Sequence, residues 1–152
     1  MTRSSKVFII GYGNPLRSDD AIGLRAAEEL AGLQFSDRIT IRQCHQLTPE
    51  LASDVKDAAI VIFIDAAHSG NPGIILWEEI HPKLESSIFT HDFSPSSILD
   101  LAQELYGKRP TKAFSVSMLG ECFDHGEKLS PSVEQNMPKL LCLVRELIEQ
   151  NA

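Results

Sequence analysis

The sequence has few cysteines, and nothing in their spacing suggests pairing. Only Cys44, Cys122 and Cys142 occur among the 152 residues, and no Cys-x-x-Cys motif is present. An odd number of widely spaced cysteines argues against a disulfide framework, and the missing motif argues against a structural zinc site. We therefore expect three reduced thiols, as is typical of a cytoplasmic protein.

Long apolar runs are also missing. The N-terminal segment contains only four consecutive apolar residues, 7–10, before Gly11. A secretory signal needs about 7–15 apolar residues and a membrane-spanning helix about 20. We therefore expect neither kind of segment and no action at a membrane.

Positive charge is scarce. There are 14 Lys and Arg against 21 Asp and Glu, the formal net charge is −7, and no basic run is longer than a pair. Nucleic-acid grooves and anionic membranes attract basic surfaces, so neither is expected as the main partner. An acidic chain instead favours a basic partner or a cation.

The rest of the composition is that of an ordinary globular protein. Hydrophobic residues make up 43% and charged residues 23%, and no repeat or linker-like stretch occurs. A chain of this length buries about 68–70% of the surface that it exposes when unfolded, which is enough for a real core. We expect one domain over residues 1–152.

Apolar runs predict five strands. The run "AIVIFID" is the most apolar and is expected at the centre of the sheet, because parallel strands that are covered on both faces lose the alternating pattern. The expected strands are Val7–Tyr12, Ile39–Cys44, Ala59–Asp65, Gly73–Glu78 and Lys112–Leu119.

Helical patterns lie between these runs. Thr48, Ser94 and Ser130 are expected N-caps, and Gly107 is expected to end a helix. The expected helices are Ala21–Leu33, a short helix starting at Thr48-Pro49-Glu50, Pro95–Tyr106, and Pro131–Gln150 with Pro138 inside it. This alternation predicts an α/β three-layer sandwich, in which helices cover both faces of a mostly parallel, twisted sheet of about five strands.

The first strand leads into a glycine-containing turn that can be tested as a nucleotide site. Gly11 and Gly13 fit a Gly-x-Gly-x-x-Gly fingerprint, but Leu16 stands at its third glycine. Asp19 and Asp20 follow, and they would repel a phosphate at the start of the helix. The turn therefore argues against a nucleotide, and we expect Asp19 to be the helix N-cap.

Three side chains are expected near the carboxyl ends of strands, where open α/β sheets bind ligands. Asp20 follows the first strand, Asp65 ends the central one, and His91 precedes the helix at Pro95. Two carboxylates and an imidazole suit a borderline divalent metal such as nickel or zinc.

Each of these residues also has a plainer interpretation. Asp20 can serve as a solvated partner of the helix dipole, Asp65 can accept hydrogen bonds from loop amides, and His91 can be an exposed loop residue. His68 is the second candidate for the imidazole and His45 the third. The chain has no Gly-x-Ser-x-Gly elbow and no His-Glu-x-x-His motif.

Three stretches resemble one known family. "GYGNPLRSDDAIG", "VIFIDAAHSGNPG" and "THDFSPSSILDLAQELYG" occur in the order and spacing of the hydrogenase maturation proteases. The first stretch is the most specific, and the resemblance extends over nearly the whole chain. "CHQLTPELA", residues 44–52, is similar to the segment after the second strand in a subgroup of these proteins.

The resemblance implies a cytoplasmic endopeptidase of aspartyl-like type. Its partner would be the nickel-loaded precursor of a nickel-iron hydrogenase large subunit, from which it removes a short C-terminal extension by one cut. Nickel would be supplied by the substrate, and zinc or cadmium would substitute in vitro. We expect a monomer that engages neither nucleic acid nor membrane.

The resemblance also assigns roles to residues. The family's metal-binding and substrate-recognising residues correspond to Asp20, Asp65 and His91, and the two aspartates are the expected catalytic residues. Several relatives carry Glu where Asp20 stands, so the shorter side chain reaches less far toward a metal. The alternatives are a non-enzymatic nickel-binding chaperone, which would leave a precursor intact, and a nucleotide-binding protein, which nucleotides would stabilise.

Overall fold

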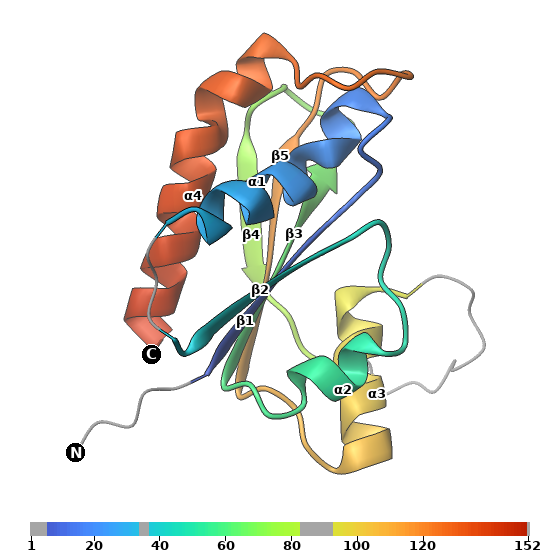
Figure 1. Ribbon diagram of the computed structural model, residues 1–152, viewed down its shortest axis with the longest axis vertical. Coiled ribbons are helices and arrows are strands. Elements are labelled where there is room, and N and C mark those ends of the chain that lie inside the picture. Colours follow the sequence, from blue (N-terminus) through green and yellow to red (C-terminus); the bar gives the residue numbers. More distant parts are fainter. Residues whose placement is uncertain (1–5, 34–36, 83–92, 152) are drawn as a thin grey trace.

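The computed structural model describes residues 6–33, 37–82 and 93–151. Within these residues one five-stranded sheet has the order β2-β1-β3-β5-β4, in which only β4 runs antiparallel to its neighbour (Figure 1). The strands are β1 (Val7–Tyr12), β2 (Ile39–Cys44), β3 (Ile60–Ala67), β4 (Ile75–Glu79) and β5 (Lys112–Leu119). The expected mostly parallel sheet is confirmed.

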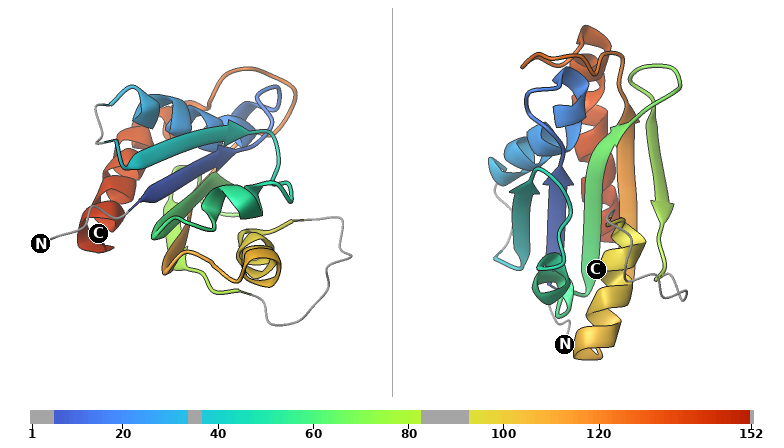
Figure 2. Two further views of the ribbon diagram at one scale, coloured as in Figure 1. Left: turned by 60° about the horizontal axis from the view of Figure 1, so that its bottom comes forward. Right: turned by 90° about the vertical axis from the view of Figure 1, so that its right-hand side faces the viewer.

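Helices cover both faces of this sheet, as expected for a three-layer α/β sandwich (Figures 1 and 2). A short 3-10 helix η1 (Ser18–Ala21) leads into α1 (Ile22–Ala31), which shares one face with α4 (Pro131–Asn151). The other face packs against α2 (Leu51–Val55) and α3 (Pro95–Tyr106). In the described part of the chain, no helix combines the length and the apolar character needed to cross a membrane.

The central strand β3 contributes to both cores because successive side chains of a strand point to opposite faces. Ile60, Ile62 and Ile64 are buried in the core under α1 and α4. Val61 and Phe63 are buried in the core under α2 and α3. Asp65 continues the second series, so its side chain belongs to the face that α2 and α3 cover.

Several elements have the predicted bounds, and the predicted caps of α3 are confirmed. Strands β1, β2 and β5 and helix α3 begin and end where the sequence pattern placed them. The Ser94 hydroxyl accepts a hydrogen bond from the Ser97 amide, and Gly107 ends α3 in the left-handed conformation. Helix α4 continues through Pro138.

Other predicted bounds were wrong. Strand β3 continues two residues past Asp65, because Ala66 and Ala67 still pair with β5. Strand β4 starts later than expected, since residues 71–74 form a turn that contains Gly73 at a φ of 87°. Thr48 is not the N-cap of α2, which starts at Leu51 without a side-chain cap.

Glycines let α1 approach the sheet closely. A Cβ on Gly23 would overlap the carbonyl oxygen of Ile64, and one on Gly11 would overlap the carbonyl oxygen of Gly23. A Cβ on Gly13, which has a φ of 150°, would overlap the carbonyl oxygen of Asp20. These glycines therefore serve close backbone packing around β1, which accounts for their spacing without a bound nucleotide.

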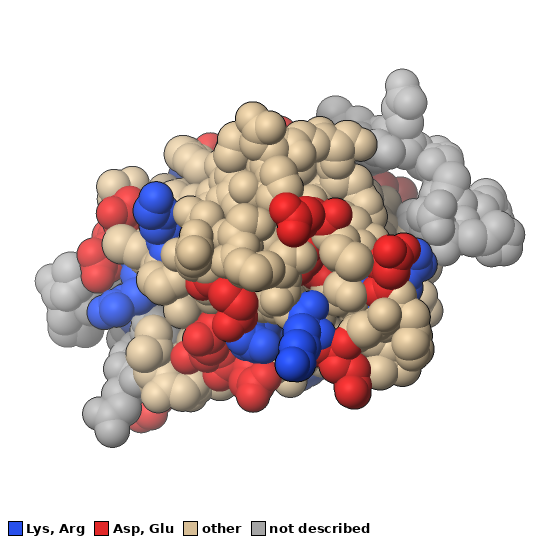
Figure 3. Space-filling view, turned by 90° about the horizontal axis from the view of Figure 1, so that it is seen from above, with Lys and Arg blue, Asp and Glu red and all other residues tan. Residues whose placement is uncertain are grey.

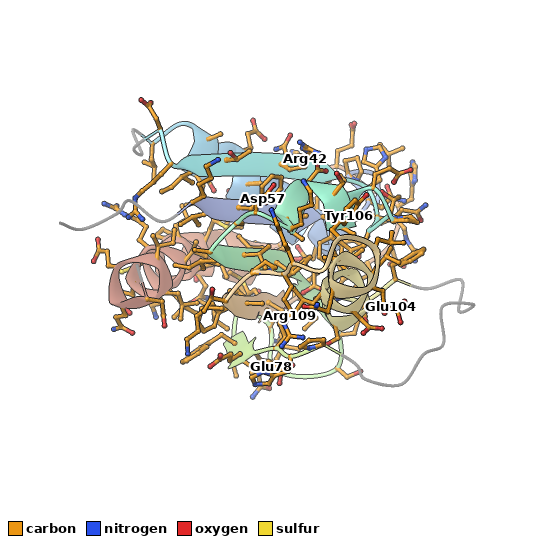
Figure 4. All side chains as sticks on the ribbon, turned by 90° about the horizontal axis from the view of Figure 1, so that it is seen from below. Arg42, Asp57, Glu78, Glu104, Tyr106 and Arg109 are labelled. Carbon is orange, nitrogen blue, oxygen red and sulfur yellow. The ribbon has the colours of Figure 1, made fainter. Side chains whose placement is uncertain are left out.

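The amino ends of the parallel strands carry a cluster of ion pairs around Asp57, which Figure 4 shows from below together with Tyr106. The Nζ atoms of Lys56 and Lys108 lie 3.0 and 3.3 Å from the Asp57 carboxylate. Lys56 Nζ also lies 5.4 Å from the centroid of the Tyr106 ring. Exposed pairs of this kind contribute little to stability, because water screens the two charges.

The opposite end of the molecule is seen from above in Figure 3. Uncharged residues cover much of the upper half of this view, and acidic and basic side chains are interspersed toward its lower edge. A nucleic-acid site needs a continuous basic stripe. This face has none, in keeping with the acidic composition of the chain.

Candidate active site

The order of the strands creates a crevice at the carboxyl ends of β1 and β3. From β1 the chain passes through α1 to β2 on one side, and from β2 through α2 to β3 on the other side of β1. Ligands of open α/β sheets bind at such a reversal of strand order.

A cavity of about 450 Å³ lies at this crevice. Its walls come from the ends of β1 and β3, from η1, from the segment after β2 and from the residue before Ser94. The lining residues are Tyr12, Gly13, Asp20, His45, Gln46, Leu47, Thr48, Pro49, Asp65, Ala66 and Phe93. Of the three predicted site residues, the cavity thus contains both aspartates.

Asp65 is a largely buried carboxyl group held by a tyrosine. The Tyr12 hydroxyl donates a hydrogen bond of 3.2 Å to Asp65 Oδ2. Burial raises the pKa of the Asp65 carboxyl to about 6, the Tyr12 hydrogen bond opposes this shift, and the negative charge of Asp20 adds to it. Burial and the Asp65 carboxylate in turn raise the pKa of the Tyr12 phenol, which therefore remains a donor.

Asp20 is positioned by the turn that follows β1. Its Oδ2 accepts a hydrogen bond of 2.7 Å from the backbone amide of Asn14. Asn14 Oδ1 in turn accepts one of 2.9 Å from the Leu16 amide, a bond that is typical of an asparagine in a turn. Asp20 thus closes the turn with one oxygen while its side chain lines the cavity.

Asp19 points away from the cavity, and its predicted role as helix N-cap was wrong. Its side chain is 0% exposed, and it accepts hydrogen bonds of 2.7–2.9 Å from backbone and side-chain groups far along the chain. The donors are the amides of Glu121, Cys122 and Ser130 and the Ser130 hydroxyl. Asp19 therefore has a structural role, whereas its neighbour Asp20 lines the cavity.

The structure separates the three candidate histidines by their place relative to the cavity. His91 lies outside the described residues, although Phe93, two residues further on, lines the cavity. His68 is exposed and stacks on Phe123 with ring centroids 3.7 Å apart, so it is not part of the cavity. His45, the third choice, is the histidine that lines the cavity.

The described residues offer carboxylate oxygens but not a complete metal site. In residues 6–33, 37–82 and 93–151, no three His, Cys, Asp or Glu side chains come close enough to hold an ion by themselves. Asp20 and Asp65 line the cavity from two different elements. Two carboxylates alone would leave most coordination positions of a metal ion to other ligands.

The pKa of Asp65 predicts an unusual pH dependence of stability. The folded chain binds a proton at Asp65 more tightly than the unfolded chain does, so stability falls as pH rises from about 4 to about 6. We expect Asp65→Asn to be more stable than the parent by about 1–2 kcal/mol at pH 8, after allowing for partial solvent access, and equal to it at pH 4. Urea unfolding at the two pH values measures this difference.

Asp57→Asn is the control for that experiment. Hydrogen bonds from Lys56 and Lys108 hold the pKa of the exposed Asp57 carboxyl below its usual range, which is the opposite direction. This variant should gain no stability at pH 8. A difference between Asp65→Asn and the parent that is the same at pH 4 and pH 8 would contradict the assignment of a raised pKa to Asp65.

Known proteins are similar to this chain in sequence and in fold. No protein-family model matches the chain. It is 27% identical over 135 residues to the hydrogenase 2 maturation protease of Escherichia coli, a match covering 85% of this chain and 82% of that protein. The structure of the hydrogenase maturating endopeptidase HybD of E. coli superposes with a TM-score of 0.73 at 26% identity, over 95% of this chain and 93% of HybD.

An archaeal structure extends the likeness in fold. The [NiFe] hydrogenase maturation protease HycI of Thermococcus kodakarensis has a TM-score of 0.75 at 22% identity, over 95% of this chain and 93% of its own. The motifs around Asp20 and Asp65, the strand order and the similarity to the E. coli enzymes converge on one answer. The chain is similar in sequence and in fold to the hydrogenase maturation proteases, and this similarity supports a peptidase.

Proposed function

We propose that this peptidase removes the C-terminal extension of a nickel-iron hydrogenase large-subunit precursor, in the cytoplasm, once nickel has been inserted. The observation that carries the proposal is the meeting of Asp20 and Asp65 in one cavity at the carboxyl ends of the strands. The names of the relatives support the substrate class, since they are hydrogenase maturation proteases.

The two aspartates would recognise the precursor through its metal. Carboxylates are suitable ligands for a divalent ion such as nickel that has vacant positions. His91 stays a predicted third ligand, outside the described residues. A precursor held in this way would present its scissile bond to the cavity in a fixed position, and fixed position alone lowers the barrier of a reaction.

Hydrolysis further requires a water molecule and a group that accepts its proton. Asp65 is suited to this second role, because a carboxyl with a pKa of about 6 is ionised at neutral pH and is a stronger base than an ordinary aspartate. The Tyr12 hydroxyl fixes one oxygen of Asp65 and leaves the group beside the cavity. We therefore assign Asp65 a second role as general base, whereas Asp20 serves as metal-binding anchor alone.

Dependence on the substrate's nickel is the sharpest consequence of this proposal. A purified precursor loaded with nickel should be shortened at its C-terminus, and the same precursor without metal should be cleaved at least about a hundred-fold more slowly, since the anchor worth several kcal/mol is missing. Mass spectrometry of both reactions measures the outcome. Reloading the metal-free precursor with zinc or cadmium tests whether another divalent ion replaces nickel.

The same experiment separates the enzyme from its main alternative. A nickel-binding chaperone would bind the loaded precursor and leave its mass unchanged. Equal cleavage of the loaded and the metal-free precursor would support the assignment as a peptidase but refute recognition of the precursor through nickel.

A further inference from the structure

A continuous stretch of chain forms one wall of the cavity. Residues 45–49, which follow β2, supply five consecutive lining residues. Leu47 is buried in the core under α2 and α3, and Leu51 at the start of α2 is buried in the same core. Figure 1 shows this teal segment running from the carboxyl end of β2 to α2. Burial of Leu47 and Leu51 therefore fixes the middle of this segment and the start of the helix that follows it.

The pairing of β1 with β2 places His45 beside the turn that holds Asp20. Cys44 is the partner of Tyr12 in the register of the two strands, and the Gly13 amide donates a hydrogen bond of 3.2 Å to the Cys44 carbonyl. His45 is thus the next residue along from this bond. Gly13 itself packs against the backbone of Asp20. Gly13 therefore contacts both Asp20 and the residue before His45, and all three line or adjoin the same cavity.

His45 is available to a ligand. Its side chain is exposed and lines the cavity. In the described part of the chain no other residue forms a hydrogen bond, ion pair or ring contact with it. An imidazole both donates and accepts hydrogen bonds, as the main chain of a peptide requires. His68 is also exposed, but it lies outside the cavity and its ring is stacked on Phe123.

The geometry favours a contact with peptide over one with metal. His45, Asp20 and Asp65 do not approach one another closely enough to share an ion. A peptide that is cut beside Asp65 must, however, pass along the cavity and bring its amide groups to the wall. We propose, on the basis of the proposed function, that residues 45–49 are the peptide-binding wall and that His45 hydrogen-bonds the precursor's main chain next to the scissile bond.

The test compares two histidines that each follow a strand, His45→Ala with His68→Ala. Cleavage of the nickel-loaded precursor should show a KM about ten-fold higher for His45→Ala, the usual effect of losing one hydrogen bond, with kcat within about two-fold of the parent. His68→Ala should change neither constant. His45→Asn, which keeps a donor and an acceptor, should recover part of the lost affinity. Thermal unfolding should be the same for all variants.

Binding of the loaded precursor, measured by surface plasmon resonance, gives a second readout that does not depend on cleavage. His45→Ala should weaken binding by a factor similar to its effect on KM. If the unaltered chain binds the precursor but leaves it whole, the peptidase assignment fails while this comparison still tests His45. Unchanged binding and KM in His45→Ala, or a loss confined to kcat, would overturn the proposed contact.

Discussion

Replacing Asp65 by asparagine should leave a folded chain that no longer cleaves the precursor. Asparagine has nearly the same size, and its side-chain oxygen can still accept the hydrogen bond from Tyr12. It cannot take a proton from water at neutral pH, and it is a weaker metal ligand than a carboxylate. We expect the rate of processing to fall by about 10³-fold or more, since loss of a general base alone costs about 10²–10⁴.

Asp20→Asn should reduce processing for a different reason. Its remaining oxygen can still accept the Asn14 amide, so the turn should keep its shape. If Asp20 binds nickel as proposed, the loss of its negative charge weakens the binding of the loaded precursor. A higher concentration of that precursor should then rescue this variant in part, and should not rescue Asp65→Asn. Asp57→Asn, at the opposite end of the sheet, should be fully active.

These variants are measured by the mass of the precursor over time, with circular dichroism as the check on folding. Normal processing by both Asp20→Asn and Asp65→Asn would show that the reaction takes place elsewhere. Inactivity of Asp57→Asn would show that loss of a distant carboxylate also abolishes processing. The losses in Asp20→Asn and Asp65→Asn could then not be assigned to the cavity.

Substitution of Asp19 should have the largest effect on stability. Four hydrogen bonds converge on this carboxylate, and each donor belongs to the segment between β5 and α4. Asp19→Asn replaces one accepting oxygen by an NH₂ group that faces those donors. We expect a loss of about 3–5 kcal/mol in the free energy of unfolding, because buried donors lose their partner. Urea denaturation at pH 7 measures it.

The size of the loss distinguishes two roles for Asp19. A helix N-cap contributes about 1 kcal/mol, so a loss of that size would favour the simpler role. The pH dependence provides a second criterion. Burial raises the pKa of the Asp19 carboxyl, but its hydrogen bonds outweigh this and hold the pKa below the usual range. Its contribution should therefore be complete above the unfolded pKa of about 4 and be lost as pH falls through the folded value.

Local patterns in the sequence predicted most of the fold because each depends on neighbouring residues. Apolar runs identify β1, β2 and β5, and the Ser94–Pro95 start and Gly107 end identify α3. The position of Asp65 near the end of a central strand was enough to place it at the ligand-binding edge. Asp20 was placed at the same edge because it follows the carboxyl end of β1.

Long-range contacts and the length of a strand account for what the sequence did not predict about Asp19 and the histidines. The partners of Asp19 are more than 100 residues away, so the sequence around Asp19 holds no sign of them. His68 was ranked above His45 because it is close to Asp65 in sequence. Strand β3 continues to Ala67, however, and His68, which follows its end, stacks on Phe123 and does not line the cavity.

The burial of Asp19 has a consequence for Asp20, its neighbour in the chain. Asp19 accepts hydrogen bonds from the segment 121–130, and these bonds fix the position of the backbone at Asp20. No residue of this segment lines the cavity. Changes in residues 121–130 can therefore shift the Asp20 carboxylate within the cavity. The chemistry of such a variant would change while every group that meets the substrate stayed the same.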